Sequence, residues 1–275
     1  MPVFLSKRNL GVSTLLVLTL TLKLTLMACL AGIVFESTAV AASGADNASV
    51  ATQNPSGVRL IKVSDSVWVH TSHFNYNGWP TPSNGMIIET ATGLILIDTP
   101  WTCEQTAELL NTTWQMFLKK PVLAVITHAH QDRIGGIAVL IADNIRVIST
   151  PQTAQLAEGA GYPRPESAID QEMMPITVGA SDSIIETYYP GPAHTADNIA
   201  IYFAAEKVLF GGCIVKSLDS NNLGNISEGS VANYQQAVQN LIDRYSDASI
   251  VIPGHGSWGG RELLTHTLDL AKAAY

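Results

Sequence analysis

Segments with strand and helix periodicity follow one another in the same order twice along this chain. Each series has several short strands and then a helix, a strand and a helix. The first series is expected at residues 58–63, 66–72, 85–90, 93–99, 103–117, 122–127, 137–142, 145–150 and 151–160, and the second at 183–190, 198–204, 207–212, 231–245, 249–254 and a last helix. Two mixed sheets packed together, with helices on both outer faces, would bury all of these apolar stripes. The sequence therefore predicts an α/β (α+β) fold, a four-layer αββα sandwich.

Residues 1–41 have the layout of a secretory signal peptide. Lys7 and Arg8 precede a long apolar stretch, which ends in the small residues Ala39-Val40-Ala41. Lys23 divides this stretch into pieces that are each shorter than the about 20 residues needed to span a bilayer, so no stable membrane span is expected. We expect cleavage near Ala41 and export to the periplasm.

Two alternatives to simple cleavage remain open for the N-terminus. The apolar stretch would act as a permanent anchor if it were retained in the membrane. Leu26-Met27-Ala28-Cys29 resembles a bacterial lipoprotein box, in which Cys29 would carry a lipid anchor. In either case residues 42–57 read as a flexible leader, and residues 58–275 as a single domain.

The charge balance disfavours one class of partner. The formal net charge of the 275-residue chain is −8, and removal of residues 1–41 takes away three basic residues and one acidic residue, which leaves −10. A chain this acidic, without a Lys/Arg cluster, is poorly suited to phosphate backbones, so no nucleic-acid partner is expected. Cys103 and Cys213 remain after cleavage. They could form a disulfide in an oxidising compartment, or Cys213 could bind a metal as a thiolate.

The stretch "THAHQDRIGG" follows the apolar run "PVLAVI" at residues 121–126. It places His128, His130 and Asp132 at alternate positions, so that all three can leave an extended segment on the same side. Three more potential metal ligands follow strands on turns that contain Gly or Pro: His194 in "PGPAHTADN", Cys213 in "FGGC" and His255 in "PGHG".

Ligand chemistry divides these six residues into two sets. Three neutral imidazoles, from His128, His130 and His194, suit a tetrahedral Zn²⁺ that keeps one position for water. The carboxylate of Asp132, the thiolate of Cys213 and the imidazole of His255 would bind a second Zn²⁺. We therefore expect two Zn²⁺ per chain and a water molecule that metal binding makes acidic.

The motifs "THAHQDRIGG", "PGPAHTADN", "GGCIVKS", "LGN" and "PGHG", in this order, resemble the metallo-β-lactamase superfamily. They are most similar to the class B β-lactamases of the broad-spectrum dizinc subclass, from about Val58 to the C-terminus. Other hydrolases of the superfamily usually read H-x-H-x-D-H and bridge the ions with an aspartate. This chain has Arg133 after Asp132, and Cys213 in the place of that aspartate.

The resemblance implies a monomeric enzyme that opens the β-lactam amide bond of small-molecule penicillins, cephalosporins and carbapenems, and so confers antibiotic resistance. Asp132 would also orient the attacking water. Lys216 would bind the carboxylate beside the lactam ring, and Asn225 would contact the developing oxyanion. The alternative for Lys216 is a solvated loop lysine.

The Asn, Gly and Pro content of residues 74–85, "FNYNGWPTPSNG", argues against regular structure, whereas the resemblance implies that this segment is a mobile hairpin, a flap that covers the active site. Trp79 would cover apolar substrate groups from the flap, unless it folds back onto the domain. Arg133 and Asp98 are expected to hold the ligand loops in place.

Two other functions are the alternatives to this hypothesis, and Cys213 argues against the first of them. A thioesterase or lactonase of the same superfamily would prefer other esters or amides and use a bridging carboxylate. A periplasmic zinc-binding protein would keep the ligands but lack Lys216 and the flap. Lactam-hydrolysing activity that a chelator abolishes would separate both alternatives from the main hypothesis.

Overall fold

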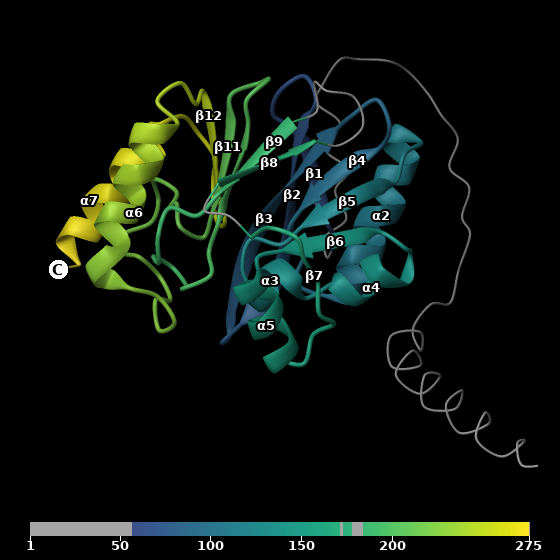
Figure 1. Cartoon of the computed structure of the whole chain (residues 1–275), viewed down its shortest axis with the longest axis horizontal. Helices are drawn as coiled ribbons and strands as arrows, with labels where there is room; N and C mark the ends of the chain where they lie inside the picture. Colours follow the sequence, from purple (N-terminus) through teal and green to yellow (C-terminus); the bar gives the residue numbers. More distant parts are fainter. Residues whose placement is uncertain (1–56, 171–172, 178–183, 275) are drawn as a thin grey trace, which may run out of the picture. The chain divides into compact units, whose positions relative to one another are not determined.

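The computed structural model describes residues 57–170, 173–177 and 184–274 (Figure 1). The expected signal peptide, Cys29 and leader residues 42–56 lie outside the described residues. Within those residues, no helix is long and apolar enough to cross a membrane.

The first half of the described chain forms a seven-stranded mixed sheet, with its strands in sequence order. The strands β1 to β4 pair antiparallel, and the strands β4 to β7 pair parallel. The bounds of these strands are β1 Arg59–Lys62, β2 Val67–Tyr76, β3 Trp79–Glu89, β4 Leu94–Ile97, β5 Pro121–Val125, β6 Arg146–Ser149 and β7 Glu166–Ser167.

The second half forms a five-stranded sheet with the order β12-β11-β10-β9-β8. Here β8 to β11 pair antiparallel, and β11 pairs parallel with β12. The bounds are β8 Met173–Thr177, β9 Ile184–Tyr188, β10 Ala200–Phe203, β11 Val208–Gly212 and β12 Ile250–Pro253. The short strands β7 and β8 carry no clear alternation and were not anticipated from the sequence.

Helices cover the outer face of each sheet (Figure 1). Those on the first sheet are α2 Cys103–Phe117, α3 Gln131–Ile134, α4 Ile137–Ala142 and α5 Pro151–Gly159, and those on the second are α6 Val231–Arg244 and α7 Glu262–Ala273. The expected bounds of α2 and α4 are confirmed. Thr102 caps α2 by accepting a hydrogen bond from the Gln105 amide, whereas the side chain of Ser230, at the N-cap position of α6, makes no such bond.

Alternation along the strands divides the apolar side chains among three layers of core. In β4, Ile95 and Ile97 face the second sheet and pack in the same cluster as Ile201 and Phe210. Leu94 and Leu96, which point the opposite way, pack with side chains of α2 and α4. A third cluster joins the second sheet to α6 and α7. The four-layer αββα arrangement predicted from the sequence is therefore present.

The expectation of irregular structure at residues 74–85, drawn from composition, is wrong, and the hairpin that the family resemblance implied is present. Residues 67–89 form one long hairpin, in which β2 and β3 pair without a break from Val67 to Tyr76. Asn77 and Gly78 form its turn, and both have left-handed φ angles, of 52° and 84°. A two-residue turn of this kind matches the twist of the flanking strands, so pairing continues up to the turn.

Two prolines in β3 are compatible with this pairing because their nitrogens point away from β2. The amide of Asn84 donates outward, to the Gly254 carbonyl at 2.9 Å. Pro80 and Pro82 have the same orientation, since alternate residues of a strand point the same way. Proline is tolerated at such edge positions. The Pro-rich composition therefore indicated an exposed edge rather than a loop.

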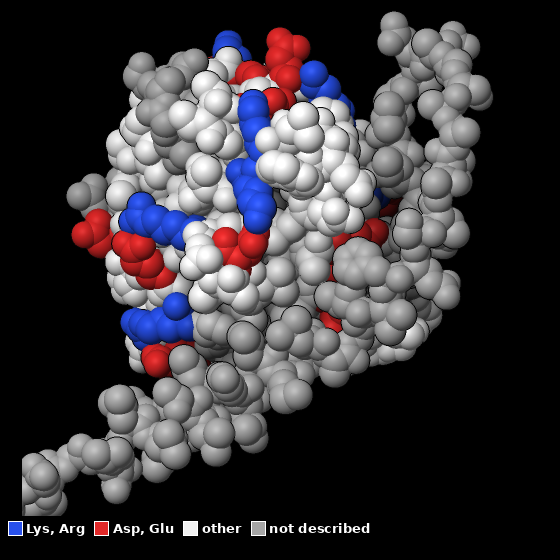
Figure 2. Space-filling model, turned by 90° about the vertical axis from the view of Figure 1, so that its right-hand side faces the viewer, with Lys and Arg blue, Asp and Glu red and all other residues white. Residues whose placement is uncertain are grey.

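The surface of the first half mixes charges of both signs. On the face in Figure 2, acidic and basic side chains lie next to each other rather than in separate fields. Four exposed or half-exposed ion pairs of this half are Lys119–Glu89, Lys120–Asp143, Arg146–Glu166 and Arg164–Glu158.

Candidate metal centre

All six predicted ligands come from segments that follow a strand, and the structure brings them together at one edge of the two sheets. They are His128 and His130 after β5, Asp132 in α3, His194 after β9, Cys213 after β11 and His255 after β12. Three overlapping groups of these side chains each have their ligand atoms within 4.8 Å of one another.

Asp132, Cys213 and His255 form one group, as the sequence predicted. The Cys213 Sγ lies 3.4 Å from His255 Nε2 and 3.6 Å from Asp132 Oδ2, and those two atoms are 3.2 Å apart. Ligand atoms bound tetrahedrally to one Zn²⁺ lie about 3.3 to 3.6 Å apart, given its usual bond lengths. The triad therefore fits a single ion of this size.

The three other histidines pack edge to face around a common point. Their ring centroids lie 4.8 Å apart for His128 and His130, 5.0 Å for His128 and His194, and 4.9 Å for His130 and His194. His130 Nδ1 and His194 Nε2 are 3.1 Å apart, close to the separation of two nitrogens on one tetrahedral ion. His128 also groups with Asp132 and with Cys213, so the two sets adjoin each other.

An unsatisfied nitrogen supports the same assignment. His128 Nε2 is buried and has no hydrogen-bond partner. Such an atom is costly unless a water molecule or an ion binds it. Burial lowers the pKa of His128 well below its usual value, with the neighbouring His194 acting in the same direction, and burial does the same for His194 together with Lys216. Both rings are therefore neutral, the form that binds metals.

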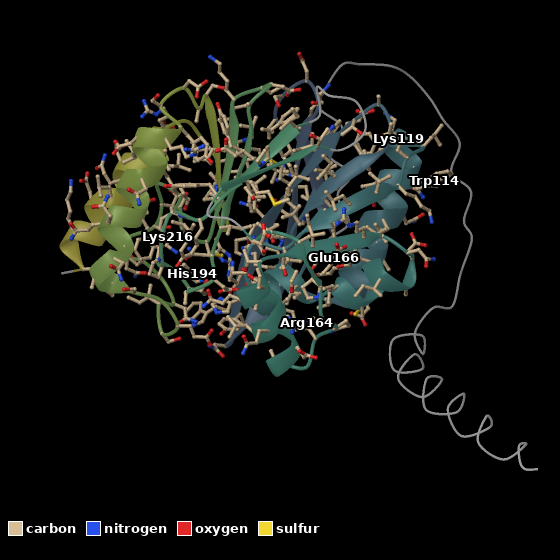
Figure 3. The ribbon with its side chains drawn as sticks, viewed as in Figure 1. Trp114, Lys119, Arg164, Glu166, His194 and Lys216 are labelled. Carbon is tan, nitrogen blue, oxygen red and sulfur yellow. The ribbon has the colours of Figure 1, made fainter. Side chains whose placement is uncertain are left out.

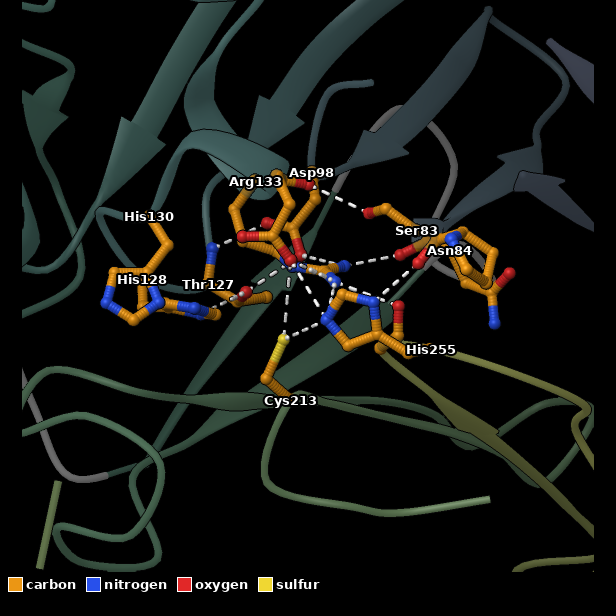
Figure 4. A network of polar contacts seen from close by, with 12 residues as sticks. Ser83, Asn84, Asp98, Thr127, His128, His130, Arg133, Cys213 and His255 are labelled. Carbon is orange, nitrogen blue, oxygen red and sulfur yellow. Dashed lines mark hydrogen bonds and ion pairs between the residues drawn. The ribbon is translucent and has the colours of Figure 1, made fainter. Parts of the chain in front are cut away.

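Arg133 lies among Asn84, Asp98 and His255 (Figure 4) and fixes the position of the Asp132 carboxylate. Its Nη2 and Nε lie 2.7 and 2.9 Å from Asp132 Oδ2, and Nη2 also donates to the Gly254 carbonyl at 2.9 Å. A further donation goes to the Asn84 carbonyl. Burial alone would raise the pKa of Asp132, but Arg133 and His255 hold it well below its usual range. Asp132 is therefore an anion ready to bind a cation.

Asp98 fixes the loop that carries the first histidines. Its two carboxylate oxygens accept hydrogen bonds from the Thr127 amide and hydroxyl, both at 2.8 Å. Its Oδ2 also lies 3.5 Å from Arg133 Nη1. Burial raises the pKa of Asp98 to about 7, against the opposing effect of Arg133. Asp197, which the sequence reading passed over, accepts from the Ala129 amide at 3.0 Å.

Four of the six ligands, His130, Asp132, His194 and His255, line a cavity of about 530 Å³, a volume suited to a small molecule. The walls come from the β2–β3 hairpin, the segment after β4 and the segment after β11. The lining residues outside the ligand set are Tyr76, Thr81, Trp101, Gln131, Lys216, Asp219, Ser220, Asn221, Asn222, Gly224, Asn225 and Glu228.

Comparison with known proteins gives the family of this fold and ligand set. A sequence model described as the metallo-beta-lactamase superfamily matches residues 78–255. The chain is 39% identical over 224 residues to a metallo-beta-lactamase type 2 of Bacillus sp. (strain 170), which covers 81% of this chain and 86% of the relative. The chain belongs to the metallo-beta-lactamase superfamily. It is therefore a member of a hydrolase family that depends on metal.

Two further relatives agree with this assignment. A metallo-beta-lactamase type 2 of Bacillus cereus is 39% identical over 215 residues, which is 78% of this chain and 83% of the relative. The solved structure of a metallo-beta-lactamase from Pontibacter korlensis is 37% identical and has a TM-score of 0.75, over 78% of this chain and 99% of that chain.

Among the residues that the family resemblance suggested for substrate binding, Lys216 and Asn225 line the cavity. Figure 3 shows Lys216 near His194. Lys216 is 8% exposed, and its Nζ donates to the Cys213 carbonyl at 2.8 Å, so it is not a solvated loop lysine. Asn225 Oδ1 accepts from the Ser227 amide and hydroxyl, which leaves its amide nitrogen to act as a donor.

Trp79 does not fold back onto the domain, and it is not among the residues that line the cavity. It is 75% exposed beside the hairpin turn. Two other aromatic residues, Tyr76 and Trp101, line the cavity instead, and their ring centroids are 5.8 Å apart. Phe74 stacks on the same Trp101 at 5.4 Å and so attaches the hairpin to the domain.

Sequence reasoning also missed Glu228, whose Oε2 lies 3.3 Å from His130 Nε2. No pattern around this loop residue distinguishes it from a solvated glutamate. For Trp101 a signal did exist, because it directly follows a buried strand at the edge where the ligands gather.

Proposed function

We propose that this protein hydrolyses the amide bond of β-lactams, including penicillins, cephalosporins and carbapenems, with two Zn²⁺ per chain. One observation carries the proposal: the Asp132, Cys213 and His255 triad adjoins three further histidines beside a cavity that a lysine also lines. The relatives' names, metallo-beta-lactamase, agree with this substrate.

The two ligand sets would each hold one ion. His128, His130 and His194 would hold the first, and Asp132, Cys213 and His255 the second. When bound, zinc supplies a Lewis acid for the lactam carbonyl and a water molecule acidic enough to act as a nucleophile near neutral pH.

The cavity residues would orient the lactam. The Lys216 ammonium would bind the carboxylate that β-lactams carry beside the ring, as a charge-assisted hydrogen bond. The side-chain amide of Asn225 would donate to the lactam oxygen as negative charge develops on it. The Asp132 carboxylate, held by Arg133, would orient the attacking water. Addition of water across the C–N bond gives a carboxylate and a secondary amine.

Hydrolysis of a chromogenic cephalosporin by the purified protein tests this proposal. We expect turnover that a chelator abolishes and Zn²⁺ restores. The same preparation should leave a thioester substrate largely intact, because a preference for thioesters would indicate another hydrolase of the superfamily. A zinc-loaded protein that turns over neither substrate would be a zinc-binding protein instead, and the proposal would be wrong.

We further propose that the enzyme acts as a monomer in the periplasm and confers resistance to β-lactams. The basic residues, apolar stretch and Ala39-Val40-Ala41 of the N-terminal segment support export. Expression of the full chain in a susceptible Gram-negative host should raise the inhibitory concentration of a penicillin and a carbapenem. Expression of residues 42–275 alone should not.

A further inference from the structure

The turn after β11 carries two residues of the site within four positions. Cys213 points its thiol at Asp132 and His255, and Lys216 lines the cavity. Gly212, in the left-handed conformation, begins the turn, and its carbonyl accepts from the Val215 amide at 3.2 Å. Movement of this turn would therefore disturb a metal ligand and the candidate substrate-binding lysine together.

The Cys213 carbonyl links the candidate metal ligand to the candidate substrate-binding lysine. It accepts from Lys216 Nζ at 2.8 Å, and the hydroxyl of Tyr234 lies 3.2 Å from the same oxygen. That hydroxyl also lies 2.8 Å from the Ile214 carbonyl. A hydroxyl has one proton to donate. The shorter distance indicates that Ile214 receives it while Lys216 occupies the Cys213 carbonyl.

We propose that Tyr234 is a positioning residue, whose hydroxyl shares its proton between the Ile214 and Cys213 carbonyls when Lys216 leaves the Cys213 carbonyl to bind the substrate carboxylate. This inference rests on the proposed function. The buried Cys213 carbonyl would otherwise lose its donor in that step, which opposes the movement of Lys216. With Tyr234 beside it, a small rotation lets the hydroxyl form a three-centre hydrogen bond to both carbonyls, so that neither is left without a donor.

The surroundings of Tyr234 suit this role. It comes from α6 and is fully buried, so no water molecule from the bulk competes for its hydroxyl. The Lys216 amide donates to Thr267 Oγ1 of α7 at 2.8 Å. The backbone of the lysine is therefore held while its side chain moves.

Tyr234→Phe tests the inference because it removes the hydroxyl and keeps the ring. We expect KM for a β-lactam with a free carboxylate to rise about two- to tenfold, the effect of one hydrogen bond, with kcat within about twofold. The matched control is Tyr245→Phe, at the end of the same helix, whose hydroxyl donates to Glu186 at 2.7 Å. It should leave both constants unchanged.

Two further measurements separate this role from a merely structural one. With the methyl ester of the same β-lactam, Tyr234→Phe should change neither constant, because Lys216 then has no carboxylate to bind. In a Lys216→Ala background, Tyr234→Phe should likewise add nothing. An unchanged KM for the free acid, or an equal effect on the ester, overturns the inference while the proposed function stands. A wild-type protein that hydrolyses no β-lactam overturns both.

If Tyr234→Phe does not fold, the inference can still be tested on the wild-type protein. The test is a structure of the zinc-loaded protein with hydrolysed product bound. Lys216 Nζ should then contact the product carboxylate, and the Tyr234 hydroxyl should approach the Cys213 carbonyl more closely than 3.2 Å. Lys216 remaining on that carbonyl in the product complex would contradict the proposed exchange.

Discussion

Arg133 binds the carboxylate of its own sequence neighbour, Asp132, through two nitrogens at 2.7 and 2.9 Å, with both side chains almost fully buried. The same guanidinium donates to backbone carbonyls of Asn84 and Gly254. One side chain thus ties the carboxylate of a candidate metal ligand to the β2–β3 hairpin and to the turn that precedes His255. Its removal should affect both stability and the metal centre.

Arg133→Ala should lower the free energy of unfolding of the metal-free protein by about 3–5 kcal/mol, because it leaves a buried carboxylate without its cation. Denaturant titration measures this change. Lys120→Ala is the control, since it removes only the exposed ion pair with Asp143. An effect of Arg133→Ala as small as that of the control would show that Asp132 does not depend on the guanidinium.

Cys213→Ser should remove one equivalent of bound zinc and lower the rate of β-lactam hydrolysis by at least about tenfold, because a hydroxyl is a poor substitute for a thiolate ligand. Metal analysis after gel filtration gives the stoichiometry. The two described cysteines, Cys103 and Cys213, form no disulfide. Cys103→Ser is therefore a matched control, and it should keep both equivalents. Retention of two equivalents by Cys213→Ser would refute the ligand assignment.

Tyr76→Ala should raise KM about two- to tenfold for β-lactams with aromatic side groups, because it removes one ring of the cavity wall and its contact with Trp101. Trp79→Ala tests the flap role that the family resemblance suggests for this exposed residue. A smaller rise for Trp79→Ala than for Tyr76→Ala would agree with their positions in the structure. The reverse order would mean that the hairpin closes over the substrate and brings Trp79 into contact with it.

Apart from β7, β8 and α3, the strand and helix order could be predicted from the sequence, and so could the convergence of the six side chains. Each ligand follows an apolar segment, so a sheet edge was the place for them to meet. The regular pairing of the hairpin was mispredicted because its prolines were weighed by composition. Their alternate spacing, with Pro80 and Pro82 on the same side of the strand, contains the information that they point outward.

Contacts between residues far apart in sequence could not be predicted in this way. In the sequence, Tyr234 is one of several residues on the apolar face of α6. Nothing in this pattern shows that its hydroxyl reaches the carbonyls of Cys213 and Ile214. The same holds for Glu228, whose approach to His130 depends on the path of a loop. Periodicity shows which face of an element is buried, but not which polar atoms meet there.

The mature N-terminus of the exported protein should begin near residue 42, because the segment that ends in Ala39-Val40-Ala41 matches a signal-peptidase site. Intact-mass measurement of protein from the periplasmic fraction checks this. A mass that corresponds to a lipid-modified chain starting at Cys29 would instead establish a membrane-anchored lipoprotein. Recovery of the full-length chain from the cytoplasm would refute export.

Zinc content and β-lactam hydrolysis, measured in the same sample, test most directly whether the six side chains hold the metals that this enzyme needs. Metal-stripped protein would be titrated with Zn²⁺ while a chromogenic cephalosporin reports turnover. We expect no turnover without metal, saturation of binding at two equivalents per chain, and full activity at that point. A protein that binds two equivalents and leaves the lactam ring intact, or that hydrolyses it without metal, would contradict the proposed function.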